Sequence, residues 1–155
     1  MAPQKQMSAP TMERFLSEER VVEIVELVRG AGDGPASTSE GHVRARGMIR
    51  DALNMAARDP LSERRADILA DLLFSALQES VAMHFSARQA SIFVSLVRVL
   101  HSRSCDERLT IEASFRLLQD LLVLFSVHRP PFSEGVFSAD EARAIMDWTM
   151  SAYYR

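Results

Sequence analysis

The sequence predicts an all-α fold, a single compact bundle of about six helices. Apolar residues recur at helical spacing in six segments. Two patterns of the form Ser-x-x-Gln/Glu, at residues 86–89 and 138–141, are typical of helix starts. No segment alternates polar and apolar residues long enough to predict a strand. With 155 residues, of which 47% are hydrophobic, the chain is long enough to bury one core.

The N-terminal part of the sequence is expected to form a disordered N-terminus, then a helix and then a flexible link. Residues 1–10 are polar, contain two prolines and lack the apolar run of a secretory signal. The helical domain is expected over residues 11–155, and its first helix from Thr11 or Glu13 to Val28. The Gly- and Ser-rich stretch of residues 30–39 predicts a flexible link. The apolar positions of this first helix are Leu16, Val21, Ile24, Val25 and Val28.

Two further helices are predicted over residues 40–58 and 61–83. Asp59-Pro60 ends the first of them, because the residue before a proline disfavours helical geometry. Gly41 and Gly47 within it each lower helix stability by about 1 kcal/mol. The apolar face of the first is expected at Val43, Met48 or Gly47, Ile49, Leu53 and Met55, and that of the second at Leu61, Ile68, Leu69, Leu72, Leu73, Ala76 and Leu77.

The next two helices are predicted to form the centre of the bundle. Ser86 opens the fourth helix, whose residues 92–100 are apolar over most of the circumference, as in a helix buried on several sides. Asp106 or Thr110 is expected to cap a fifth helix. That helix becomes apolar toward its end, at Leu117, Leu118, Leu121, Leu122, Val123, Leu124 and Phe125.

A connector of residues 126–137 then leads to the sixth helix, which Ser138 opens. Pro130 drives Arg129 toward extended geometry, and both connector prolines fix their own backbone angle. Two interpretations stay open: Phe132 and Phe137 fold back over the apolar end of the fifth helix, or the same residues form a surface for a partner. The sixth helix is expected to bury Ala142, Ile145, Met146, Trp148, Thr149 and Tyr153.

The sequence gives no pattern for catalysis, a cofactor or a metal. The four histidines lie in different segments without metal-ligand spacing, and Cys105 stands beside two acids that would raise its thiol pKa. The net charge of -3 gives no reason to expect nucleic acid or an anionic membrane as partner. We therefore expect a non-enzymatic protein of the cytoplasm without a membrane span. The histidines are His42, His84, His101 and His128.

A basic stretch over residues 84–103 lacks acidic residues and carries bulky apolar side chains, which is one pattern of a calmodulin target. The alternative is a buried core helix, and it is favoured because the segment is apolar nearly all round. The candidate calmodulin-type residues are Phe85, Arg88, Phe93, Val97, Arg98, Leu100 and Arg103.

Three motifs carry a family resemblance. They are Ser-Val-His-Arg-Pro-Pro-Phe at residues 126–132, Phe137-Ser138 opening a helix that ends in Tyr153-Tyr154-Arg155, and Phe-Ser-Ala-Arg-Gln at residues 85–89. Over residues 61–155 the chain resembles a family of small cilia- and flagella-associated proteins of a central-pair apparatus projection. Vertebrate members of that family are named as coiled-coil-domain-containing proteins.

The resemblance implies a structural subunit of the axoneme, placed in a projection of a central-pair microtubule and contributing to control of flagellar beating. The implied partners are a large scaffold protein, related small subunits and calmodulin, with an indirect association with microtubules. The alternative is a calcium-linked calmodulin-binding adaptor not restricted to the axoneme. The candidate partner-binding residues are His128, Arg129, Pro130, Pro131, Phe132, Phe137, Trp148, Tyr153 and Tyr154.

Overall fold

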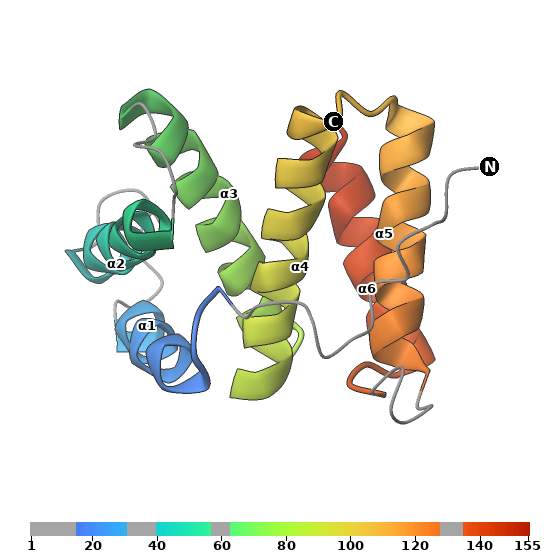
Figure 1. Cartoon of the computed structure of the whole chain (residues 1–155). Helices are drawn as coiled ribbons and strands as arrows, with labels where there is room; N and C mark the ends of the chain where they lie inside the picture. Colours follow the sequence, from blue (N-terminus) through green and yellow to red (C-terminus); the bar gives the residue numbers. More distant parts are fainter. Residues whose placement is uncertain (1–14, 31–39, 57–62, 128–134) are drawn as a thin grey trace. The chain divides into compact units, whose positions relative to one another are not determined.

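The computed structural model describes residues 15–30, 40–56, 63–127 and 135–155, and in these ranges every regular element is helical (Figure 1). The predicted all-α class with six helices is thereby confirmed. The expected disorder of residues 1–10 and nearly all of the expected link lie outside the described residues. The helices are α1 (Glu18–Gly30), α2 (Glu40–Ala56), α3 (Glu63–Ala82), α4 (Ala87–Asp106), α5 (Ile111–Ser126) and α6 (Ala139–Trp148), and a π-helical turn, Thr149–Tyr153, follows α6.

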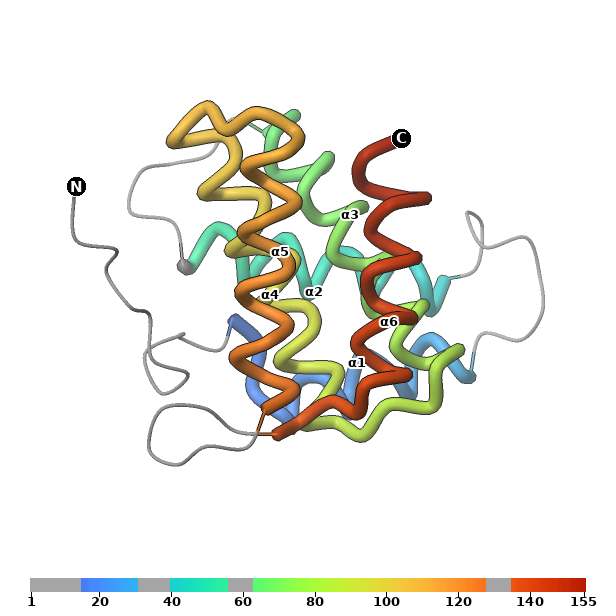
Figure 2. The backbone as a smooth tube through the Cα atoms, turned by 90° about the vertical axis from the view of Figure 1, so that its right-hand side faces the viewer, coloured from blue at the N-terminus to red at the C-terminus, as the bar shows by residue number. Residues whose placement is uncertain are grey.

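The chain divides within α4 into two compact units, one ending at Arg98 and the other continuing from Val99. In the first unit, α1 and α2 lie side by side and run in opposite directions, and α3 crosses them (Figures 1 and 2). Two ion pairs join α2 to α3: Arg46 with Asp71, and Arg50 with Asp67 at 3.2 Å.

The buried face of α2 differs from the predicted one. Val43 is 57% exposed and Met55 is 87% exposed, so both assignments were wrong, whereas Ile49 and Leu53 are buried as predicted. A helix repeats every 3.6 residues, and the true inner face combines Ile49 and Leu53 with His42 and a small Ala45. The sequence favoured the bulkier apolar residues, which here lie on other sides of the helix.

The prediction for the core face of α3 contains the same kind of error. Ile68, predicted to be buried, is 60% exposed, while Leu73 and Leu77 are buried as expected. The small residues Ala66 and Ala70 continue that face toward the start of the helix. Small side chains let neighbouring helices approach closely, so they enter the core even where a larger apolar residue is available nearby.

The first helix begins later than predicted, at Glu18 rather than at residue 11 or 13. The Phe15 amide donates to Ser95 Oγ of α4 at 2.9 Å, and Ser91 Oγ of α4 donates to the Leu16 carbonyl. These bonds use backbone groups that a longer helix would need for itself. Ser17 Oγ then accepts from the Arg20 amide at 3.2 Å, which caps the new start.

The second unit contains the end of α4, then α5 and α6, which run in opposite directions (Figure 2). Thr110, one of the two predicted caps, accepts from the Ala113 amide at the start of α5. The predicted capping box at Ser138 is present in full at the start of α6. The core of this unit includes Leu118, Leu121, Leu122, Phe125 and Ile145.

The turns that follow α3 and α4 have the same geometry. His84 and Arg108 have φ of 57° and 48°, the left-handed region that favours glycine. Phe85 donates to the Ser80 carbonyl at 2.9 Å and Leu109 to the Ser104 carbonyl at 3.0 Å, the bond pattern of a Schellman motif. A non-glycine residue therefore ends each helix.

Candidate protein-interaction site

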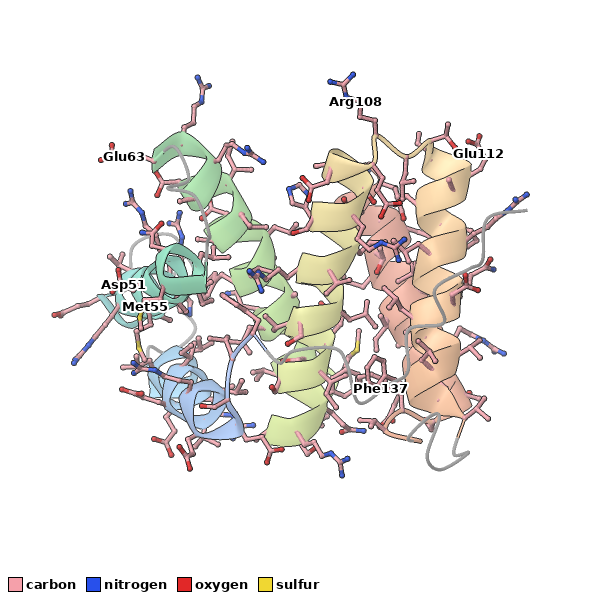
Figure 3. All side chains as sticks on the ribbon, in the orientation of Figure 1. Asp51, Met55, Glu63, Arg108, Glu112 and Phe137 are labelled. Carbon is pink, nitrogen blue, oxygen red and sulfur yellow. The ribbon has the colours of Figure 1, made fainter. Side chains whose placement is uncertain are left out.

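The structure describes both ends of the connector. The amides of Val136 and Phe137 donate to the Phe125 carbonyl, at 2.6 and 3.0 Å, so the returning chain is fixed to the last turn of α5. Phe137 is only 3% exposed and lies beside the end of α5 (Figure 3). Phe137 therefore serves the protein's own fold, as one of the two interpretations predicted. The other connector candidates, His128, Arg129, Pro130, Pro131 and Phe132, lie outside the described residues.

The three aromatic candidates near the C-terminus are all partly buried. Tyr154 OH and Ser114 Oγ are 2.7 Å apart, and Ser114 Oγ lies 2.7 Å from Ser104 Oγ. We call Ser104, Ser114 and Tyr154 the hydroxyl chain. It joins the end of α4, the start of α5 and the C-terminal turn, so Tyr154 acts within the fold. Trp148, the third aromatic candidate, is half-buried on α6.

Tyr153 and Tyr154 are placed by the π-helical turn. The Tyr154 amide donates to the Thr149 carbonyl at 3.1 Å, five residues back, and Thr149 Oγ1 donates to the Ile145 carbonyl at 2.8 Å. The wider turn brings the two tyrosine rings edge to face, 5.0 Å apart between centroids. Two consecutive tyrosines can thereby face the same part of the fold.

Tyr153 contacts a histidine on α4. Its hydroxyl lies 3.3 Å from His101 Nδ1, and the two rings meet edge to face at 6.0 Å. Desolvation by burial raises the pKa of both Tyr153 and Tyr154. Cys105 is exposed, with Sγ 3.7 Å from His101 Nε2. A phenol whose pKa is raised is a weaker acid, so both tyrosines keep the hydroxyl proton that these contacts use.

The residues of the calmodulin-type pattern divide by burial. Phe93, Val97 and Leu100 are at most 1% exposed in the folded chain. Arg98 lies over the Phe15 ring, 4.8 Å from its centroid, and Arg103 pairs with Glu107 at 2.8 Å. The remaining members are the partly buried Phe85 and the exposed Arg88. The apolar anchors that calmodulin would need are thus enclosed by the fold.

Sequence reasoning missed the polar face of α4 that holds residues 15 and 16. Ser91 and Ser95 are buried, and Ser95 Oγ donates to the Ser91 carbonyl at 2.8 Å while it accepts from Phe15. With Arg98 they form an i, i+4, i+7 series on one face. Two serines in a helix that is otherwise apolar all round were the available signal.

Neither a metal site nor a membrane span is found in the part of the chain that the structure describes. Within it, no three His, Cys, Asp or Glu side chains gather as ligands for an ion. None of the described helices combines the length and apolar character that a bilayer span requires.

Exposed apolar side chains in the second unit lie near both ends of α5. Val123 is 59% exposed and Val127 is 36% exposed, where the chain enters the connector. Ile111, 68% exposed, stands at the start of the same helix, beside Glu112 (labelled in Figure 3). Val127 is the C-cap that follows α5, and its amide donates to the Val123 carbonyl at 3.1 Å, so the two valines lie close together at the end of the helix. They form a small apolar surface next to the connector.

The comparison with known families covers most of these features. Residues 75–155, more than half of the 155-residue chain, match the family model described as CLAMP, flagellar C1a complex subunit C1a-32. The match includes all of α4, α5, α6 and the connector, and it confirms the resemblance inferred from the connector motif, although it begins at residue 75 rather than 61. The chain therefore belongs to the CLAMP family, whose members are subunits of the C1a complex in the central-pair apparatus of the flagellar axoneme.

Proposed function

We propose that the chain is a non-enzymatic structural subunit that mediates assembly of the C1a projection and thereby contributes to control of flagellar beating. The proposal is supported by the family match over residues 75–155. Its contact surface is the connector, which includes Val127, together with Val123 of α5. Its partners are a large scaffold protein and related small subunits, and its association with microtubules is indirect.

One observation carries the assignment of the connector as the contact surface. Val127 donates to the Val123 carbonyl at 3.1 Å, and Val136 donates to the Phe125 carbonyl, so both ends of the connector are fixed at the last turn of α5. A segment whose ends are held by a rigid helix is well placed to contact a partner. The exposed Val123 and Val127 stand at the same place and extend the surface with apolar area.

The test is incorporation of a variant into axonemes. Arg129→Glu combined with Phe132→Ala is expressed in flagellated cells that lack the native protein, and Arg143→Glu on the exposed side of α6 serves as the control. We expect the double variant to fold normally, to remain soluble after detergent extraction and to recover few other projection subunits in a pull-down. Normal incorporation would contradict the proposal. A variant that fails to fold would instead show that these residues cap α5.

The calmodulin-binding adaptor is distinguished by the burial of Phe93, Val97 and Leu100. We expect a peptide of residues 84–103 to bind calcium-loaded calmodulin more tightly than the full chain does, because the fold encloses its anchors. Isothermal titration of both forms, with and without calcium, measures this difference. Equally tight, calcium-dependent binding of the full chain would favour the adaptor over the structural subunit.

A further inference from the structure

The outer side of α2 carries a surface that the family match does not cover, since α2 ends before residue 75. Glu40, Arg44, Gly47, Asp51 and Met55 are all exposed and recur at spacings of three and four residues, so they share one side of the helix. Figure 3 shows Asp51 and Met55 on the side of α2 that faces away from α3. We call these five residues the α2 outer face.

Gly47 is the unusual residue of this face. It lies in the middle of a helix of 17 residues, where glycine lowers helix stability. A Cβ at this position would meet nothing within 4 Å. Neither a turn nor a close neighbour in the described chain therefore requires glycine here. The absence of a side chain does allow a second backbone to approach α2 closely.

The charges beside Gly47 indicate which partner would fit. Arg44 precedes Gly47 by three residues, and Asp51 follows it by four. When two copies of α2 cross in opposite directions about a twofold axis near Gly47, Arg44 of each copy faces Asp51 of the other. In the same arrangement Met55, 87% exposed in the single chain, lies over the start of the partner helix near Glu40.

A parallel arrangement is disfavoured by the same residues. In a parallel pair, each charged residue would face the same residue of the second chain, and like charges repel. This holds for Glu40, Arg44 and Asp51. Arginine and aspartate already pair across helices in this unit, where Arg50 of α2 meets Asp67 of α3 at 3.2 Å. Neither Arg44 nor Asp51 forms an ion pair with another described residue.

From these observations we propose that the α2 outer face is a self-association surface, through which two copies of this chain pair by antiparallel contact of their α2 helices. The glycine permits close approach, the exposed methionine adds apolar contact and the self-complementary charges set the direction. The pairing uses no residue of the connector or of α5, so it does not rest on the proposed function.

The first experiment is sedimentation equilibrium of the full chain over a wide concentration range. We expect a reversible monomer–dimer equilibrium. Arg44→Asp alone and Asp51→Arg alone should each weaken the dimer about tenfold or more, because each places like charges opposite one another twice. An equimolar mixture of the two variants should restore it, since their faces are then complementary. Arg143→Asp on α6 is the control and should leave the equilibrium unchanged.

A second variant separates pairing from folding. Gly47→Gln adds a good helix former and a bulky side chain, so the unfolding temperature should rise while the dimer weakens. A native chain that stays monomeric at every concentration reached would overturn the proposal. A dimer whose dissociation constant is unchanged by either charge reversal would also overturn it. So would an equimolar mixture of the two variants that does not dimerise.

Discussion

The polar contacts that join helices differ between α2–α3 and the C-terminal end. The ion pairs of Arg46 and Arg50 with α3 have side chains that are 38% to 55% exposed. In the hydroxyl chain, by contrast, the central Ser114 is buried and its two neighbours are partly buried. Water and salt compete with the exposed pairs, whereas the buried hydroxyls have few other partners.

The difference follows the boundary of the family match. Residues 75–155 contain the hydroxyl chain, the π-helical turn and the buried Phe137, whereas both partners of each ion pair lie outside that range. The matched part thus has its helix ends fixed by buried contacts, while α2 is joined to α3 partly through exposed charges. This comparison predicts that substitutions in the two places differ in size and in their response to salt.

The largest effect is expected at Phe137. Phe137→Ala should lower the free energy of unfolding by about 3 kcal/mol, since it removes a buried ring beside the end of α5. Met150→Ala, at a residue 50% exposed, is the control and should change it by less than about 0.5 kcal/mol. Urea unfolding followed by circular dichroism measures both. A loss below about 1 kcal/mol at Phe137 would show that it does not hold the connector to α5.

The next effect is expected in the hydroxyl chain. Ser114→Ala should cost about 2 kcal/mol, because it leaves the Ser104 and Tyr154 hydroxyls without their shared partner. Tyr154→Phe should cost about 1 kcal/mol, and the double variant less than the sum of the two. Urea unfolding of the three variants gives the free energy of coupling between residues 114 and 154. Strictly additive losses would mean that the three hydroxyls do not act together.

The same tyrosines give a pH response whose sign follows from burial. Their pKa is raised in the folded chain, so the folded state holds these protons more tightly than the unfolded state. The stabilisation is complete below the ordinary tyrosine pKa of about 10 and is lost as the pH rises through the raised value. Tyr154→Phe should reduce the loss of stability at alkaline pH, which thermal unfolding at pH 9 to 11 would detect.

Several parts of the fold could be predicted from the sequence because their chemistry is local. The boxes at residues 86–89 and 138–141 and the cap at Thr110 each depend on residues three apart, and all three are present. The left-handed turns at His84 and Arg108 could not be predicted, since no glycine marks them.

Contacts between residues that are distant in the sequence could not be predicted either. The outward position of Val43 and Ile68 depends on which neighbours α2 and α3 meet, and helical spacing alone admits more than one face. The bond from Phe15 to Ser95 spans 80 residues, and it decides where α1 begins. At the candidate site, the connector motif predicted the family, but the burial of Phe137 required the fold.

A smaller effect is expected at the two capping boxes, one in each unit. Ser86→Ala and Ser138→Ala should each cost about 1 kcal/mol, because each removes the acceptor for an amide at a helix start. Both serines are exposed, so the two losses should be similar, unlike those of the ion pairs and the hydroxyl chain. Urea unfolding compares them directly. A much larger loss at Ser138 would show that the start of α6 also supports the connector.

The smallest effect is expected at the exposed ion pair between Arg50 and Asp67. Asp67→Asn should lower the free energy of unfolding by about 0.5 kcal/mol at low salt, because the side chains are 38% and 53% exposed and water already screens them. In about 1 M salt, where the screening length is about 3 Å, the loss should vanish. The loss from Ser114→Ala should persist there, since no charge is involved. If both losses responded equally to salt, the distinction between exposed charge pairs on α2–α3 and buried hydroxyl contacts at the C-terminal end would fail.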